Sequence, residues 1–244
     1  MEKLGPGSNA DTLHVLAMIP HDAFAVVVDA GSGIGRQTLA LAGRLQTTVH
    51  AVDTSEKHLD SLARYSAEFG IPHLVETHCM DMADIPAIFP AIDLLWSECA
   101  AYHIGFPLAL ETWFPAIRPG GYAVVSELSW LRDEVPDHLR TYFGSGYPDM
   151  RTMEQNLAIA RAAGYEVIAT HLLSDAAWID GYYDKLEPLA QSLLQHPDKA
   201  VRNIADQTLK GIRIFDSAAG NYGYVFYVLR KPSSNAPAPR HANG

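Results

Sequence analysis

Short apolar runs alternate with amphipathic stretches along most of the chain. Runs rich in β-branched residues predict strands at 26–29, 48–53, 73–78, 92–98, 122–130, 165–173 and 222–231. Apolar positions at helical spacing predict helices between them, at 36–45, 55–69, 106–117 and 152–163. Strands that alternate with helices indicate a parallel sheet. We therefore expect a doubly wound, Rossmann-like α/β fold with seven strands and helices on both faces.

Two segments depart from this alternation. Residues 174–221 separate the last two predicted strands and contain two helical stretches, at 178–195 and 198–216. An insertion of this size is either a cap over a substrate or a dimerisation element, and both interpretations stay open. Residues 132–149 are predicted to be a long polar and aromatic connection.

The two ends of the chain differ from the middle in composition. Residues 5–11 predict a flexible start followed by a helix, because Ser8 and Asp11 have the spacing of a capping box. The tail 232–244 is rich in Pro, Ser, Ala and Asn, which predicts disorder. Residues 1–231 are therefore expected to form one domain that carries the helical insertion.

A glycine-rich loop follows the first predicted strand. The strand ends at Asp29, and the chain continues as Ala-Gly-Ser-Gly-Ile-Gly before the next helix. Glycines there allow a tight turn and close approach of the backbone to a ligand, and the helix aims its N-terminal N–H groups at that ligand. A dinucleotide fingerprint would need a third glycine at Arg36, and a Walker loop would need Gly-Lys-Ser/Thr. A short-chain dehydrogenase would need a Tyr-x-x-x-Lys pair, whereas the residue four positions before Lys185 is Gly181 instead of tyrosine.

The spacing Asp-x-Gly-x-Gly-x-Gly resembles motif I of the class I S-adenosylmethionine-dependent methyltransferases. Asp53, 24 residues after Asp29, ends the second strand, where the resemblance implies hydrogen bonds to the ribose hydroxyls. Asp81 ends the third strand, where it either accepts from the adenine amino group or caps the following turn. S-adenosylmethionine is thus the implied cofactor. The implied cofactor-binding residues are Asp29, Gly31, Ser32, Gly33, Gly35, Asp53, Asp81, Met82 and Glu98.

Candidate catalytic residues follow the fourth strand. Ligands of doubly wound sheets bind beyond the carboxyl ends of the strands, so Glu98 and His103 are expected near the methyl donor. His103 has an intrinsic pKa that suits a general base, and Glu98 could orient it, bind the substrate or bind the methionine amino group. A structural hydrogen bond is the alternative for His103.

Aromatic residues and one further acid are candidates for an acceptor pocket. The predicted substrate-binding residues are Tyr102, Glu127, Trp130, Tyr147, Trp178 and Tyr182, with Tyr183 beside them. Aromatic side chains can line such a pocket, but packing in the core explains them equally well, and Glu127 could instead cap a loop.

Charge and cysteine content limit the partners. The formal net charge is −10 and Lys and Arg form no cluster, which argues against nucleic acid and anionic membranes. Cys79 and Cys99 lack paired spacing, so neither disulfides nor a metal site are expected. With no signal peptide or membrane-spanning run, the expected location is the cytoplasm.

The expected function is methyl transfer from S-adenosylmethionine to a small-molecule acceptor, of the bacterial small-molecule type. The sequence leaves open which atom accepts the methyl group (O, N, S or C) and whether the protein forms a homodimer. A catalytically silent S-adenosylmethionine-binding protein and an NAD(P)-dependent dehydrogenase are the alternatives.

Overall fold

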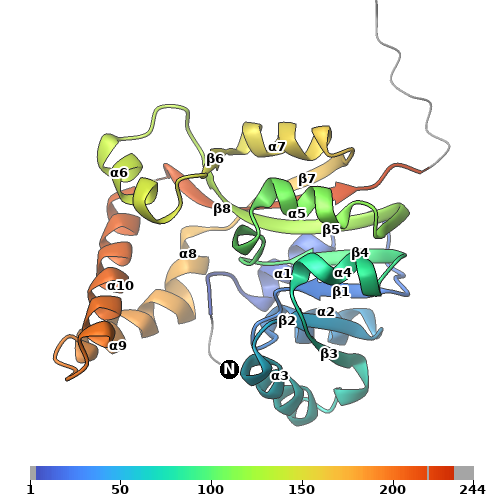
Figure 1. The fold of residues 1–244 in the computed structure, drawn as a ribbon, viewed down its shortest axis with the longest axis horizontal. Coiled ribbons are helices and arrows are strands. Elements are labelled where there is room, and N and C mark those ends of the chain that lie inside the picture. Colours follow the sequence, from blue (N-terminus) through green and yellow to red (C-terminus); the bar gives the residue numbers. More distant parts are fainter. Residues whose placement is uncertain (1–3, 219, 234–244) are drawn as a thin grey trace, which may run out of the picture.

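A twisted β-sheet runs through the centre of the protein (Figure 1), which this computed structural model describes over residues 4–218 and 220–233. Seven strands lie in the order β3-β2-β1-β4-β5-β8-β7. Their bounds are β1 Val27–Ala30, β2 Val49–Asp53, β3 Val75–Cys79, β4 Ile92–Ser97, β5 Ile117–Trp130, β7 Glu166–Leu172 and β8 Tyr222–Arg230. A two-residue strand, β6 (Arg151–Thr152), pairs with the end of β5. The predicted seven-stranded doubly wound sheet is confirmed.

The strand directions place a switch point at β1 and β4. The chain runs outward from β1 to β2 and β3, then returns to the other side of β1 to form β4 and β5, and all these neighbours pair in parallel. β8 runs antiparallel to both β5 and β7. At such a reversal the connections after the two central strands leave in opposite directions, which opens a crevice at their carboxyl ends.

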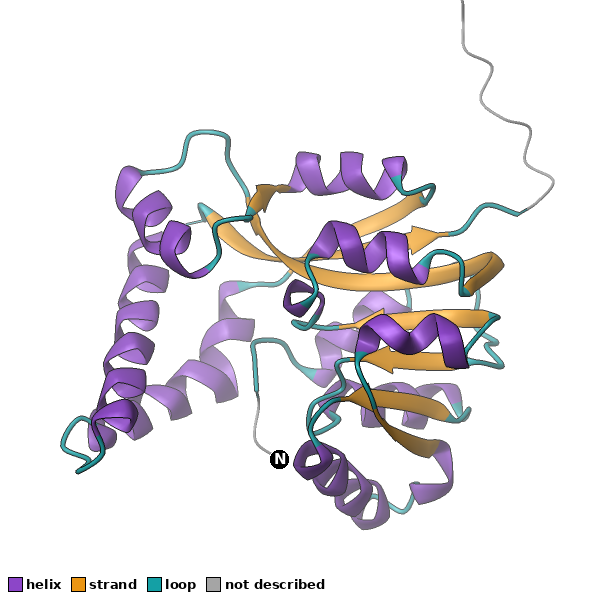
Figure 2. Cartoon of the chain, viewed as in Figure 1, coloured by secondary structure: helices purple, strands orange, loops and turns teal. Residues whose placement is uncertain are grey.

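Helices cover both faces of the sheet (Figure 2). One face carries α4 (Ile85–Ile88), α5 (Phe106–Trp113) and α7 (Met153–Ala162), and the other carries α1 (Asn9–Leu16), α2 (Arg36–Leu45) and α3 (Glu56–Glu68). Alternate residues of β1 serve the two cores, since Val28 packs with the α5 side and Val27 with the α2 side. A strand buried on both faces explains why the sequence of β1 is a continuous apolar run.

The capping box at the start of the chain forms as predicted. The backbone N–H of Ser8 donates to Asp11 at 2.8 Å, and the Ser8 hydroxyl accepts from the Asp11 N–H at 3.2 Å. Val15 and Leu16 of α1 are buried against the sheet. The predicted disordered tail, 232–244, lies for the most part outside the described residues.

The connection after β5 contains a helix that the prediction lacked. α6 (Asp137–Gly146) begins after Pro136 and buries Leu139 against the rest of the protein. Leu139 and Phe143 have helical spacing, but Gly144, Ser145 and Gly146 are poor helix formers and hide this short pattern. The predicted polar and aromatic connection therefore contains a helix that its sequence pattern did not indicate.

Two boundaries near β5 also differ from the prediction. α5 ends at Trp113 instead of residue 117, and β5 begins at Ile117. The predicted turn at Pro119–Gly121 is an irregularity within β5. Ile117 pairs with Ile92, and after a shift in register Tyr122 pairs with Leu94.

The helical insertion lies beyond the carboxyl ends of the parallel strands (Figure 1). It contains α8 (Asp175–Trp178), a kinked π turn (Ile179–Tyr183), α9 (Asp184–Leu193) and α10 (Lys199–Ala218). The first predicted helix is thus broken, because Asp180 is extended and Gly181 adopts a left-handed conformation with φ of 73°. Across the described ranges, none of the helices has both the length and the apolar character required to cross a membrane.

Candidate functional site

A cavity of about 500 Å³ lies at the switch point of the sheet. Its walls come from the glycine-rich loop and α2 (31–37), from the ends of β2 and β3 (52–55 and 80–82), from the segment after β4 (98–100 and 102–104), and from residues 4–6 and His58. Cavities of this size accommodate drug-sized and cofactor-sized molecules. Most of the predicted cofactor-binding residues therefore share one cavity.

The three loop glycines have positive φ angles of 76°, 55° and 86° at Gly31, Gly33 and Gly35. A Cβ atom at Gly31 would overlap Ala100, and one at Gly35 would overlap Leu62, so these two glycines permit packing. A Cβ atom at Gly33 would meet only Leu4, at 3.1 Å. Because Leu4 is itself a wall residue of the cavity, Gly33 is the position at which the backbone is bare toward a ligand.

Asp29 lies beneath the loop and does not line the cavity. Its carboxylate accepts from the Thr38 hydroxyl at 2.5 Å and from the Gln37 amide at 3.3 Å. Burial raises its pKa to about 7. The expected direct contact between Asp29 and the cofactor is therefore absent from this geometry, and the carboxyl instead joins β1 to the first turn of α2.

Two other acids do line the cavity. Asp53 accepts from the backbone N–H groups of Gly33 and Ser55, at 2.8 and 2.9 Å, which anchors the glycine loop to the end of β2. Asp81 accepts from the Ala83 N–H at 2.8 Å, so the capping role holds, yet its side chain and that of Met82 both lie in the cavity wall.

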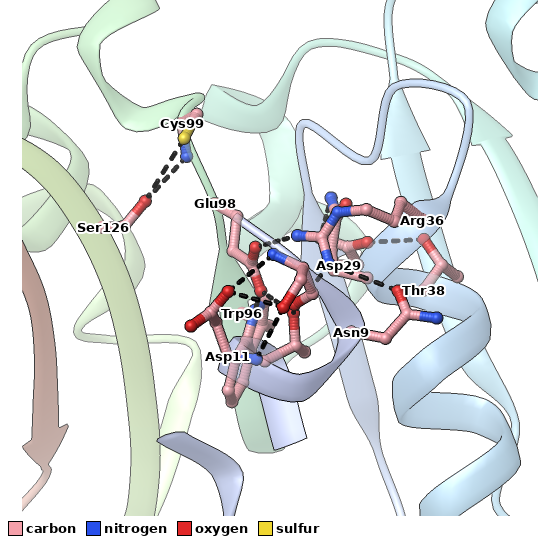
Figure 3. A network of polar contacts seen from close by, with 12 residues as sticks. Asn9, Asp11, Asp29, Arg36, Thr38, Trp96, Glu98, Cys99 and Ser126 are labelled. Carbon is pink, nitrogen blue, oxygen red and sulfur yellow. Dashed lines mark hydrogen bonds and ion pairs between the residues drawn. The ribbon is translucent and has the colours of Figure 1, made fainter. Parts of the chain in front are cut away.

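Glu98 is the centre of a buried polar network (Figure 3). Its carboxylate accepts from Thr12 at 2.7 Å and from the Trp96 indole at 2.8 Å, and it is paired with the Arg36 guanidinium. Arg36 also lines the cavity. It was not among the predicted site residues, because its partner Glu98 is 62 residues away in the sequence and no local pattern connects the two. The structure thus places a paired positive and negative charge in the wall of the cavity.

His103 does not pair with Glu98, whose oxygens are held by the network above; the idea that Glu98 orients His103 was wrong. The His103 imidazole lies in the cavity wall and packs on the Tyr102 ring, with 4.1 Å between the ring centroids. Tyr102 in turn belongs to the walls of two cavities.

A second cavity, of about 220 Å³, adjoins the first. Leu4, Gly5, Pro6, Cys99 and Tyr102 line both. The remaining walls are mostly aromatic and come from α6, the insertion and β8: Tyr142, Phe143, Trp178, Tyr182, Tyr183, Tyr222 and Tyr224, with Leu128 and Gly211. The structure brings Tyr102, Trp178, Tyr182 and Tyr183 together in one cavity wall, and it adds aromatic residues of α6 and β8 that the sequence did not indicate.

Three predicted substrate residues lie outside this cavity. Trp130 packs edge-on against Phe143 in the core beneath α6. Glu127 is buried and accepts from the Tyr147 hydroxyl at 2.5 Å and from the Leu128 N–H at 3.0 Å. In the described part of the chain the second oxygen of Glu127 has no hydrogen-bond partner, and burial raises the pKa of this carboxyl to about 7.

The raised pKa of Glu127 predicts a pH dependence of stability. The folded protein keeps a proton on Glu127 at pH values where the unfolded chain has lost it, so the free energy of unfolding should fall as pH rises from 4.5 to about 7. We expect Glu127→Gln to remove about 3 kcal/mol of this decline. Urea unfolding across this pH window measures it. The raised pKa of Asp29 lowers stability in the same direction, but Asp29 is present in both the parent and the variant. If the free energy of unfolding falls equally with pH in both proteins, the decline does not come from Glu127.

The sheet order and the cavity at its switch point define a Rossmann-like α/β protein with a site shaped for a nucleotide-type cofactor. The profile of a methyltransferase domain family matches residues 27–121. Malonyl-[acyl-carrier protein] O-methyltransferase of Marinomonas sp. (strain MWYL1) is 29% identical over 172 residues, which are 68% of this chain and 62% of the relative. Trans-aconitate 2-methyltransferase of Paracidovorax citrulli is 30% identical over 195 residues, 75% of this chain and 66% of the relative. The chain thus spans less than two thirds of these relatives.

The fold agrees with a solved methyltransferase structure. The S-adenosylmethionine-dependent methyltransferase of Geobacter sulfurreducens, solved with S-adenosyl-L-homocysteine, superposes with a TM-score of 0.77 at 18% identity over 94% of this chain and 93% of that one. The family profile, the curated relatives and this fold agree with one another. The chain belongs to the class I S-adenosylmethionine-dependent methyltransferases.

Proposed function

We propose that this protein transfers the methyl group of S-adenosylmethionine to a small-molecule acceptor. The observation that carries the proposal is the pairing of the two cavities, which share walls at residues 4–6, Cys99 and Tyr102. The larger cavity suits the cofactor, and the smaller aromatic cavity suits the acceptor. A cytoplasmic location and the absence of nucleic-acid partners stay predictions from the composition.

The larger cavity fits S-adenosylmethionine in charge and shape. The bare backbone at Gly33 makes room for a ligand, and the buried Ser32 hydroxyl, which has no partner among the described residues, remains free to bond to one. Arg36 and Glu98 offer opposite charges to the carboxylate and ammonium of an amino-acid group. The Glu98 carboxylate in the same cavity suits an ammonium group and would repel a dinucleotide pyrophosphate, which disfavours a dehydrogenase.

The remaining contacts divide along the same cavity. We assign the ribose hydroxyls to Asp53 and the adenine to Asp81 and Met82, which lie at the ends of neighbouring strands. Asp29 supports the loop through Thr38 and Gln37. Glu98 is assigned to the cofactor rather than to catalysis, because its two oxygens are already engaged by Thr12, Trp96 and Arg36.

The cofactor supplies a methyl carbon activated by a sulfonium for in-line displacement. This chain contributes alignment and exclusion of water, which the mostly aromatic walls of the smaller cavity provide. His103 is the candidate to accept a proton where the acceptor arrives protonated, since its imidazole lies beside Tyr102 at the junction of the cavities.

The insertion is proposed to serve both of its candidate roles, in different parts. Its base, α8 and the π turn, supplies Trp178, Tyr182 and Tyr183 to the acceptor cavity and acts as a cap. Its outer arm, α9 with the first half of α10, has its own small core and leaves Leu189 55% and Ile204 65% exposed. Exposed apolar residues of this kind suit a homodimer contact.

The proposal is tested by two measurements. Calorimetric titration with S-adenosylhomocysteine and, in parallel, NAD should show saturable binding of the first alone. Incubation with methyl-labelled S-adenosylmethionine and a metabolite extract should then yield a labelled product. Binding without any product would favour the silent cofactor-binding protein, and binding of NAD alone would favour the dehydrogenase.

Asp53→Ala is expected to weaken binding of S-adenosylhomocysteine by about 1.5–3 kcal/mol. The variant loses the charge-assisted contacts proposed for the ribose and also the hydrogen bond to the Gly33 N–H. Calorimetry measures the change. Asp60→Ala, on the exposed surface of α3, is the matched control and should bind as the parent does. Equal affinity of Asp53→Ala and the parent would remove Asp53 from the site.

A further inference from the structure

Two histidines and a glutamate gather on one face of the sheet, away from both cavities. His50 lies on β2, and Glu76 and His78 lie on the neighbouring β3. In the parallel ladder His50 stands opposite Glu76, while Val52 stands opposite His78. Residues two apart on a strand share a face, so the register brings all three side chains together. None of them lines the cavities described above.

The potential ligand atoms of the three groups lie close together, with one atom from each residue within 4.8 Å of the others. Nδ1 of His50 and Nε2 of His78 are 3.1 Å apart. The two oxygens of Glu76 face one ring each, 3.4 Å from the His50 nitrogen and 3.6 Å from the His78 nitrogen. A tetrahedral zinc ion with ordinary bond lengths to nitrogen and oxygen separates its ligand atoms by about 3.3–3.5 Å. Each of these three separations is therefore close to the distance between neighbouring ligand atoms on zinc, and one donor atom from each residue lies within 4.8 Å of the others.

A purely hydrogen-bonded cluster fits these distances less well. One imidazole N–H can donate to the other ring, which accounts for the contact between the histidines. A carboxylate that paired with a charged imidazole would close to about 2.7–2.9 Å, yet both contacts of Glu76 are longer.

The surroundings hold the rings in place. The Phe89 ring packs against both imidazoles, with centroids at 5.0 Å from His50 and 5.3 Å from His78. Phe89 is buried, whereas the two histidine side chains are 20% and 19% exposed. Solvent can therefore reach the exposed side of the three groups, where a water molecule could serve as a fourth ligand.

We propose that His50, Glu76 and His78 form a binding site for a divalent transition-metal ion of the zinc type. Two imidazoles and one carboxylate, with water as a fourth ligand, suit zinc. The ion would join β2 to β3, the edge strand that leads directly into Met80–Met82 in the cavity wall. The proposed site revises the expectation that the protein has no metal site. That expectation rested on the spacing of residues along the sequence, which does not reveal a cluster formed by side chains of two neighbouring strands.

The test is a metal titration of the untagged, chelator-treated protein. Calorimetry with ZnCl₂ should give one equivalent bound with a dissociation constant at or below about 1 µM. CoCl₂ should give the visible absorption of a tetrahedral cobalt site. Zinc at 100-fold above its dissociation constant should raise Tm by about 5–10 °C.

Variants locate the site. His50→Asn, Glu76→Gln and His78→Asn should each weaken zinc binding by more than about 100-fold, since loss of an outer partner alone costs 10- to 100-fold. Circular dichroism checks that each variant is folded. His73→Asn and Cys79→Ser remove an exposed histidine and an exposed thiol near the cluster and should bind zinc as the parent does. A parent without saturable binding, or a folded His50→Asn or His78→Asn that keeps its affinity, would overturn the proposal.

Discussion

Gly33→Val is expected to lower the affinity for S-adenosylhomocysteine by at least about 100-fold, equivalent to about 2.7 kcal/mol, and to leave a folded protein. The branched side chain would project from the loop toward Leu4, into the space proposed for the cofactor. The left-handed φ of 55° costs a non-glycine residue about 1–2 kcal/mol, which is small beside the usual stability of a domain. Calorimetry measures the affinity, and thermal unfolding measures the stability.

Gly43→Val is the matched control for this prediction. Gly43 lies on α2, the helix that follows the loop, and a Cβ atom there would have no neighbour within 4 Å. This variant should bind S-adenosylhomocysteine as the parent does and lose only some helix stability. Gly31 and Gly35 are poor choices, because their substitution would disturb packing with Ala100 and Leu62. A folded Gly33→Val variant that binds within about tenfold of the parent would remove the loop from the cofactor site.

The parallel half of the sheet could be predicted because its signals are local. The strand at Val27–Ala30 is a continuous apolar run, and the glycines that follow it mark the turn into α2. The acids at Asp53 and Asp81 follow strand ends, and strand order alone brings these ends to one edge. Fold class and most of the cofactor cavity therefore follow from patterns within about 15 residues of each position.

The roles of the buried acids could not be predicted in the same way. Asp29 lies near the end of β1 and Glu98 directly follows β4, yet Asp29 bonds to Thr38 beneath the loop, whereas Glu98 lines the cavity and pairs with Arg36. Which side of a turn a carboxylate takes depends on partners that are distant in sequence, such as Thr12, 86 residues away. A strand-end acid thus indicates the neighbourhood of a site and not the contact that it makes.

The aromatic cavity shows the same limit. Trp130 and Trp178 look alike in the sequence, but Trp130 is packed beneath α6 while Trp178 lines the cavity and stacks on Tyr224. The difference depends on α6, whose weak helical pattern went unnoticed, and on the antiparallel return of β8 beside β5. Assembly of separate segments, rather than residue type, decides which aromatic residues face the acceptor.

Tyr182→Ala is expected to lower kcat/KM for the acceptor by about 10- to 100-fold and to spare the affinity for S-adenosylhomocysteine. Tyr182 lines the acceptor cavity, lies outside the walls of the cofactor cavity, and stacks on Tyr183 with ring centroids at 5.2 Å. Its removal widens the cavity and admits water, which loosens the alignment that displacement needs. The rate of labelled methyl transfer to the product found in the metabolite extract gives the first quantity, and calorimetry gives the second.

Leu189→Glu, in the outer arm of the same insertion, separates the cap from the proposed interface. Leu189 is exposed on α9 and lines neither cavity, so turnover per site should equal that of the parent. If the outer arm joins two copies, the charge should lower the mass seen by light scattering, because a desolvated carboxylate in an apolar contact is costly. Full turnover of a folded Tyr182→Ala variant would refute the cap. A Leu189→Glu variant that stays dimeric, or a parent protein that is already monomeric, would refute the interface. The tests of the cap and of the interface are independent, because the base and the outer arm of the insertion have separate hydrophobic cores.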